Sequence, residues 1–143
     1  MIVVDTNVLG YASGSEHPLR DAARSLFAAG ARGRLPVTTT PAVLQEFVHL
    51  YSRRRSRTEA VAQARRLLTL LTPLVPTTQE DVPVALRLFE RYERLSAFDS
   101  LLAAVALRED VTAFVSADRA FEGVPKLPFV ELGSRELDPL IGA

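Results

Sequence analysis

The sequence IVVDTNVLGY at residues 2–11 joins three β-branched apolar residues directly to an aspartate. A short apolar run of β-branched residues is typical of a strand buried on both faces of a parallel sheet. A carboxylate is costly inside such a layer unless it has compensating partners. Asp5 therefore marks the end of the strand, and Thr6 and Asn7 begin the turn that leads into a short helix.

The rest of the chain alternates short apolar strands with longer helical segments. Further strands are predicted at 35–39, 74–75, 112–116 and 128–132. Helices are predicted at 7–12, 18–29, 41–55, 58–71, 79–94 and 96–108. This alternation indicates one α/β domain, residues 1–143, with a largely parallel central sheet. Sites in such sheets form beyond the carboxyl ends of the strands, which is where Asp5 falls.

A second aspartate repeats the arrangement of Asp5. The apolar strand at 112–116 ends in Ser116, and Asp118 follows two residues later. Because parallel strands end at the same edge of a sheet, we expect Asp5 and Asp118 to lie on one edge.

Two further acids lie on helices among apolar neighbours. Asp99 stands near the start of the helix at 96–108, and the residues three, four and seven positions later are all apolar. Glu46 lies beyond the first turn of the helix at 41–55 and shares its side with Val43 and Leu50. Both carboxylates are therefore predicted to face the core.

Each aspartate also has an ordinary structural explanation. Asp5 can cap the short helix that follows it, and Asp118 can cap the turn before Phe121. Ser96 and Asp99 match a capping box, which stabilises a helix start by about 1 kcal/mol. Glu46 has no such explanation, so it needs either an arginine or a divalent cation as its partner.

The four acids Asp5, Glu46, Asp99 and Asp118 are predicted to converge on one edge of the sheet. Carboxylates packed together repel one another and raise each other's pKa values. A hard divalent cation removes that penalty, and Mg²⁺ and Mn²⁺ both prefer oxygen ligands. We therefore predict a Mg²⁺ site that Mn²⁺ can also fill, of the oxygen-only kind used in metal-assisted phosphodiester hydrolysis.

The composition argues against several other classes of site. The chain has no cysteine, which removes disulfides, zinc ribbons and thiol catalysis, and its two histidines make a multi-histidine metal site improbable. The net charge of zero gives no global sign of nucleic-acid binding. We expect no membrane association and a cytoplasmic location, because no apolar run reaches the roughly 20 residues of a membrane span and no basic stretch precedes the first apolar segment.

Four stretches together resemble the PIN-domain ribonucleases: VVDTNVL at 3–9, the helical Glu46, FDSLLAAVA at 98–106 and VSADRAF at 115–121. Their order and spacing carry the resemblance, which covers essentially the whole chain. The length and layout are similar to those of VapC-like toxins of type II toxin–antitoxin pairs. The resemblance implies a three-layer α/β/α sandwich with a central, largely parallel sheet.

The resemblance also implies a Mg²⁺- or Mn²⁺-dependent endoribonuclease, a hydrolase that cuts RNA. Asp5, Glu46, Asp99 and Asp118 would be its metal ligands and catalytic acids. Thr6, Asn7 and Ser116 would lie beside them and contact the carboxylates or the substrate. Many relatives carry a further acid or amide two residues after the last aspartate, whereas this chain has Ala120. One dominant Mg²⁺ is therefore expected.

The run RRRSR at 53–57 is the densest basic segment. Arg53 follows Glu46 by seven residues, about 10 Å along the same side of the helix. Arg53 and Arg54 are thus predicted to contact RNA phosphates. The alternative is a solvated helix end whose cations complement the helix dipole.

The segment 59–75 carries more leucine than one buried stripe requires. Leu67, Leu68, Leu70 and Leu71 cannot all face one core, so this segment is either an interface or a helix buried on two sides. The resemblance implies two protein partners, a cognate antitoxin and a second copy of the chain.

Three other functions compete with the nuclease. A catalytically silent PIN-like domain would only bind partners. A receiver-like signalling module needs an aspartate at the end of a mid-chain strand, but the strands predicted around Val37 and Val75 end in threonine and proline. A phosphatase of the haloacid dehalogenase type needs an aspartate two residues after the first, where this chain has Asn7.

Overall fold

The computed structural model describes residues 1–71 and 73–142, and its centre is a parallel sheet. The sheet has four strands in the order β2-β1-β3-β4. They are β1 (Ile2–Val4), β2 (Val37–Thr38), β3 (Ala113–Ser116) and β4 (Phe129–Glu131). Every neighbouring pair is parallel, so the strands end at one common edge. The predicted parallel sheet is confirmed.

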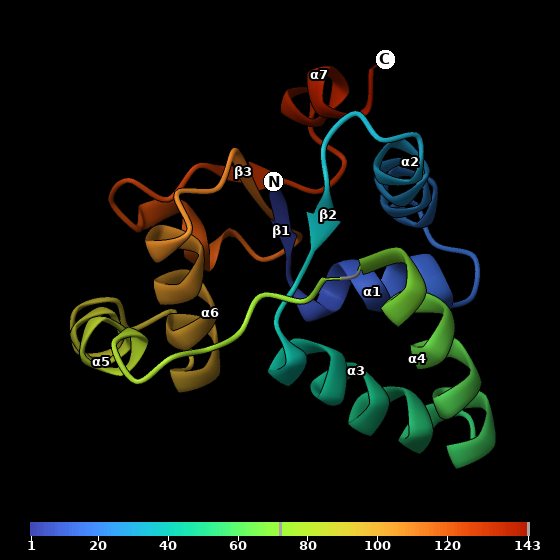
Figure 1. The fold of residues 1–143 in the computed structure, drawn as a ribbon, viewed down its shortest axis with the longest axis horizontal. Coiled ribbons are helices and arrows are strands. Elements are labelled where there is room, and N and C mark those ends of the chain that lie inside the picture. The colour runs from blue at the N-terminus through green and yellow to red at the C-terminus, as the bar shows by residue number, and fades with distance from the viewer. Residues whose placement is uncertain (72, 143) are drawn as a thin grey trace.

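Helices cover the sheet on both sides. They are α1 (Thr6–Ser13), α2 (Arg20–Ala31), α3 (Pro41–Arg54), α4 (Arg57–Leu71), α5 (Asp81–Arg91), α6 (Ala97–Arg108) and α7 (Asp138–Ile141). Two 3₁₀ helices, η1 (Arg119–Gly123) and η2 (Arg135–Leu137), lie near β4 in the sequence. Figure 1 shows α5 and α6 on one side of the sheet and α1 and α2 on the other, with α3 and α4 projecting below α1. The three-layer α/β/α arrangement is confirmed.

The central strands are buried, as the opening run of β-branched residues predicts. Val3, Val4 and Phe114 are fully buried, and Phe114 packs against Phe121 with ring centroids 4.6 Å apart. Three helix starts are capped by side chains, because Asp5, Thr40 and Ser96 each accept a backbone N–H bond at the head of a helix. The caps at Asp5 and Ser96 confirm the sequence predictions. These caps fix where α1, α3 and α6 leave the sheet edge.

The predicted strand at 74–75 is wrong. Val75 donates a hydrogen bond to the carbonyl of Thr39 (2.9 Å), yet the segment joins no ladder. Pro73 and Pro76 on either side have no N–H to donate, so the pairing cannot extend. The sheet therefore ends at β2 on this side.

The leucine-rich segment divides between core and surface. Leu67 and Leu71 of α4 are buried, whereas Leu68 is 43% and Leu70 49% exposed. Burial on two sides, one of the two predictions for this helix, is wrong. No helix in the described ranges 1–71 and 73–142 is long and apolar enough to cross a membrane.

Candidate active site

Asp5 lies at the end of β1, only 6% exposed, and is held by three hydrogen bonds. Its Oδ1 accepts from the backbone N–H of Thr6 (2.7 Å). Its Oδ2 accepts from the hydroxyl of Ser116 (2.8 Å) and from the amide of Asn7 (3.2 Å). The capping role predicted for Asp5 is confirmed, and the same bonds fix the orientation of its carboxylate.

The environment of Asp5 disfavours its negative charge. Burial raises its pKa most, the hydrogen bonds from Ser116 and from the Thr6 N–H lower it, and the nearby carboxylates of Asp99 and Glu46 raise it. Together these effects raise the pKa of Asp5 to about 6. All three donors are neutral, so no positive charge compensates the carboxylate. This crowding of negative charge is what a divalent cation relieves.

Asn7 and Ser116 join the ends of β1 and β3. The Asn7 amide donates to the Ser116 hydroxyl (3.0 Å), and its oxygen accepts from the Ala117 N–H (3.1 Å). The Ser116 hydroxyl in turn accepts from the Asp118 N–H (2.9 Å). Asp118 caps η1 by accepting from the Ala120 N–H (2.9 Å), which confirms its predicted capping role. The network places Asp118 on the same sheet edge as the first aspartate.

Asp99 lies in the first turn of α6 and is half-buried. Its N–H donates to the Ser96 hydroxyl (3.0 Å), as the capping box predicts. Burial raises the pKa of Asp99, hydrogen bonding from Ser96 lowers it, and the carboxylates of Asp118 and Glu46 raise it. The net direction is upward. Asp99 therefore interacts electrostatically with Asp118 and Glu46, and its carboxylate also raises the pKa of Asp5.

Glu46 is exposed, so the prediction that it faces the core is wrong. The buried side of α3 carries Val43, Leu44 and Phe47, and Glu46 lies about 100° around the helix from Phe47. Its Oε2 accepts a hydrogen bond from the Thr6 hydroxyl (2.7 Å). Glu46 is thus held at the site by a hydroxyl on α1 rather than by an arginine.

Three of the four acids line one cavity. Asp5, Glu46 and Asp99 border a space of about 420 Å³, and Phe98 stands on its rim with 75% of its surface exposed. Asp118 is outside the lining but close enough to raise the pKa of Asp99. The cavity is therefore an acidic cleft at the end of the sheet.

The donor set of this cleft fits a hard cation, because all four side chains offer oxygen and none offers sulfur. Within residues 1–71 and 73–142, no group of three or more acidic or histidine side chains is already close enough to hold a metal ion. A cation would draw the carboxylates together and offset the repulsion that raises the pKa values of Asp5 and Asp99.

A fifth acid, Asp81, is buried away from the cleft at the start of α5. It accepts a hydrogen bond from the Thr78 N–H (2.7 Å). It also forms a two-pronged ion pair with Arg108, at 2.7 Å to Nε and 3.1 Å to a terminal nitrogen. This pair joins α5 to the end of α6.

The family of the chain follows from comparison with known proteins. Residues 2–127 match the family model described as PIN domain. The chain belongs to the PIN-domain family. It is 48% identical to Ribonuclease VapC7 of Mycobacterium tuberculosis over 122 residues, which cover 85% of this PIN domain and 84% of that protein. It is 34% identical to VapC ribonuclease Mb1869c of Mycobacterium bovis over 126 residues, covering 87% and 95%.

Two solved structures share the PIN fold seen here. VapBC2 from Rickettsia felis, bound to a DNA fragment from its promoter, gives a TM-score of 0.74 over 92% of this chain and 98% of that chain. At 18% identity this likeness concerns the fold alone. VapC20 of Mycobacterium tuberculosis, a toxin that cleaves the Sarcin-Ricin loop, gives a TM-score of 0.70 at 25% identity, covering 89% and 98%.

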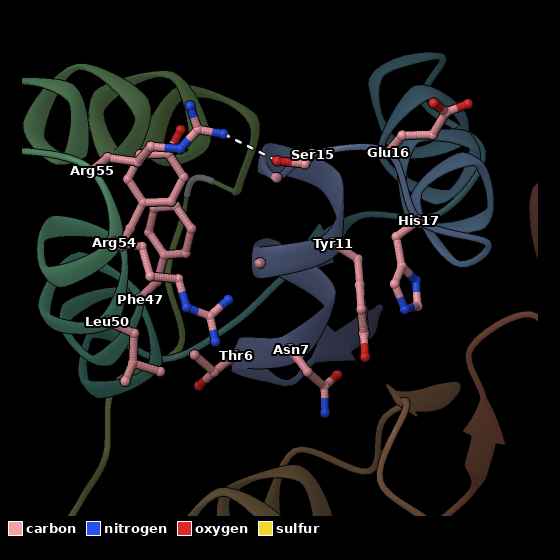
Figure 2. A pocket seen from close by; sticks show the side chains of 13 residues that line it. Thr6, Asn7, Tyr11, Ser15, Glu16, His17, Phe47, Leu50, Arg54 and Arg55 are labelled. Atoms are coloured by element: carbon pink, nitrogen blue, oxygen red, sulfur yellow. Dashed lines mark hydrogen bonds between the residues drawn. The ribbon is translucent and has the colours of Figure 1, made fainter.

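The two arginines predicted to contact RNA have different surroundings in this PIN domain. Arg53 lies beside His49, with 3.5 Å between nitrogen atoms, and His49 lines the acidic cleft. Arg54 lines a separate groove between α1 and α3, where its guanidinium points toward Thr6 (Figure 2). Both side chains are exposed. Their contact with RNA remains a prediction.

The sequence analysis missed two features beside the site. Phe98 is an exposed aromatic residue on the rim of the cleft, and it was taken only as part of the motif that contains Asp99. Gly10 opens the groove beside Thr6, and helical periodicity assigns no role to a residue without a side chain. A glycine inside a short helix was the one available signal.

Proposed function

We propose that this PIN domain is a metal-dependent endoribonuclease and the toxin of a toxin–antitoxin pair. The observation that carries the proposal is the acidic cleft. It gathers Asp5, Glu46 and Asp99 at the end of the sheet with Asp118 beside them, and no cationic side chain among residues 1–71 and 73–142 compensates Asp5. The ribonuclease names of the similar VapC proteins support the same activity.

Asp5, Glu46, Asp99 and Asp118 are the proposed ligands of one Mg²⁺, which Mn²⁺ can replace. When bound, such a cation polarises a phosphoryl oxygen and lowers the pKa of a water molecule that attacks it. The chain itself orients the proposed metal ligands through hydrogen bonds. Ser116 and Asn7 hold the Asp5 carboxylate, and Thr6 holds Glu46. We propose these three as positioning residues.

Arginines on α3 are the proposed contacts to the RNA backbone. Arg54 has no carboxylate partner within the described part of the chain, so its charge is available to a phosphate. Arg53 lies next to His49 at the edge of the cleft and is the second proposed contact. Exposed cations of this kind add salt-dependent affinity without sequence preference.

The test is cleavage of total cellular RNA by the purified protein with Mg²⁺, with Mn²⁺ and with EDTA. We expect discrete fragments with either metal and none with EDTA. Asp99→Ala is expected to abolish the fragments while remaining folded, because Ser96 still caps α6 through its hydroxyl. Metal-independent fragments, or equal cleavage by Asp99→Ala, would contradict the proposal. A silent partner-binding domain instead predicts no cleavage and no metal binding.

Two protein partners belong to the proposal. The solved VapBC2 complex supports a cognate antitoxin as one of them. The second is another copy of the chain, bound through α5. Its side chains Val82, Leu86 and Phe89 follow helical spacing and are 44%, 61% and 50% exposed. An apolar stripe of this kind marks an interface.

Self-association can be measured by light scattering on a sizing column. Leu86→Glu is expected to convert a dimer to a monomer. Ala28→Glu changes an exposed apolar residue on α2, on the other side of the sheet, and is expected to leave the dimer intact. A dimer that survives Leu86→Glu would exclude the α5 face. We further propose that residues 1–143 act as one domain in the cytoplasm.

A further inference from the structure

The groove between α1 and α3 adjoins the acidic cleft, because Thr6 of the groove hydrogen-bonds to Glu46 of the cleft. It encloses about 430 Å³, within the range of small-molecule sites. Thr6 and Asn7 line the groove and also hydrogen-bond to the carboxylates of Glu46 and Asp5. Anything that fills the groove therefore lies directly beside the proposed scissile phosphate.

The α3 wall of the groove is apolar and aromatic with arginines at its rim, whereas the cleft is acidic. The α3 wall is lined by the half-exposed Leu50 and by Tyr51. Arg54 and Arg55 stand at the rim (Figure 2). Arg55 donates a hydrogen bond to the hydroxyl of Ser15 (3.3 Å), whereas Arg54 has no ion-pair partner within the described ranges 1–71 and 73–142. Apolar and aromatic walls with an arginine at the rim suit a nucleotide, whose base is flat and whose phosphate is anionic.

Gly10 forms the opposite wall. A β-carbon added there meets no atom within 4 Å, so any side chain at this position would project into the groove. Glycine inside a helix costs about 1 kcal/mol relative to alanine. Helix α1 thus lacks a side chain at a position where a side chain would narrow the groove.

We propose that this groove receives the base of a nucleotide adjacent to the cleaved bond, with Arg54 on its phosphate. The inference rests on the proposed ribonuclease function and adds a base-binding subsite to it. Position favours RNA as the occupant over a peptide, because Thr6 and Asn7 of the groove hydrogen-bond to the carboxylates of the proposed cleavage site. The guanidinium of Arg54 points toward Thr6 and complements a phosphate there (Figure 2). The subsite would admit an unpaired base, since a stacked base pair cannot enter between two helices.

The experiment measures binding apart from cleavage. The Asp99→Ala protein in EDTA is titrated with a fluorescent pool of short single-stranded RNA of random sequence, and anisotropy reports the Kd. Gly10→Leu is expected to raise the Kd by about 10-fold, because stacking of one base contributes about 1–3 kcal/mol. Gly123→Leu is the matched control, since a β-carbon at Gly123 also meets no atom within 4 Å and lies outside the groove. Its Kd is expected to equal that of the parent.

The salt dependence of the Kd separates the contribution of the base from that of the phosphate contact. Gly10→Leu is expected to weaken binding with an unchanged salt slope, whereas Arg54→Gln is expected to reduce the slope by about 0.7, the value for one phosphate of a single strand. Thermal unfolding checks that Gly10→Leu is at least as stable as the parent, as helix propensity predicts.

A Kd for RNA that Gly10→Leu leaves unchanged would overturn the subsite, whether or not the wild-type protein cleaves RNA. Failure of the ribonuclease proposal itself appears separately, as absence of metal-dependent cleavage by the wild-type protein.

Discussion

Two buried aspartates in this PIN domain have opposite electrostatic environments. Asp5 and Asp81 are 6% and 2% exposed, and each accepts several hydrogen bonds. Burial raises the pKa of Asp5 to about 6 because its donors are neutral and its charged neighbours are carboxylates. Burial also opposes the charge of Asp81, but hydrogen bonds from Arg108 and from the Thr78 N–H outweigh it and hold its pKa below the ordinary value.

The difference separates a structural acid, Asp81, from a proposed metal ligand, Asp5. Arg108 neutralises Asp81 within the chain, so that carboxylate needs nothing from outside. Asp5 has no such partner and faces Asp99 and Glu46, so its charge is compensated only when a cation arrives. Depth of burial alone therefore does not identify a site, whereas the sign of the surrounding charge does.

The largest expected effect comes from neutralising the functional acid. Asp5→Asn keeps the size of the side chain but removes a proposed metal ligand, so we expect kcat/KM for RNA cleavage to fall by about 1000-fold, equivalent to about 4 kcal/mol. The metal-free variant is expected to unfold at a higher temperature than the wild type, because a charge disfavoured by burial has been removed. A large loss of stability together with activity would place Asp5 in the structural class instead.

Neutralising the structural pair is expected to do the reverse. Arg108→Gln leaves the buried Asp81 without its cation and should lower the free energy of unfolding by about 2–3 kcal/mol, less than a fully buried pair because Arg108 is 31% exposed. Urea denaturation measures this change. Cleavage per folded molecule should stay at the wild-type rate. A fall in this rate alongside the fall in the free energy of unfolding would show that the ion pair also affects the cleft.

Removing the hydroxyl that holds Glu46 tests a proposed metal ligand that is exposed rather than buried. Thr6→Val keeps the shape of Thr6 but loses the 2.7 Å hydrogen bond to Glu46. We expect about a 10-fold fall in metal affinity, as is usual for groups that orient metal ligands. Thr6→Ser keeps the hydroxyl and should retain most of the affinity, measured by titration with Mn²⁺. Equal affinities for the two variants would show that Glu46 needs no support.

The smallest expected effect is the pH dependence of the structural pair. The folded pKa of Asp81 lies below its ordinary value of 3.8, so the ion pair stabilises the fold fully above that value. The stabilisation declines as pH falls through 3.8 toward the lower folded pKa. The difference in unfolding free energy between the wild type and Arg108→Gln should thus be constant near neutral pH and narrow in acid. A difference that persists in strong acid would show that Arg108 acts through packing.

The sequence predicted the parts of the site that depend on local order. The strand ending in Asp5, the parallel partner ending in Ser116 and the capping box at Asp99 all follow from short patterns, and the structure confirms each. Membership of the PIN-domain family also followed from motifs in their order. Placement of the four acids as metal ligands remains a prediction.

The errors lie where one helix meets another element. Glu46 was expected in the core because its neighbours along the helix are apolar, but the packing of α3 leaves that side open to Thr6. The pairing of Asp81 with Arg108 joins residues 27 positions apart and has no local pattern. The groove at Gly10 depends on the separation of two helices, which periodicity does not report.

The bond between Ser116 and Asp5 spans 111 positions of the chain. Strand β1 is made first during synthesis but sits between β2 and β3, and the hydroxyl that orients its aspartate is made much later. A ribosome that has released only the first half of the protein has therefore produced Asp5 and Glu46 without Asp99, Ser116 or Asp118. If the four acids are the metal ligands as proposed, the nascent chain is expected to stay inactive until β3 has emerged and paired, and fragments that end before Asp99 are expected not to cut RNA.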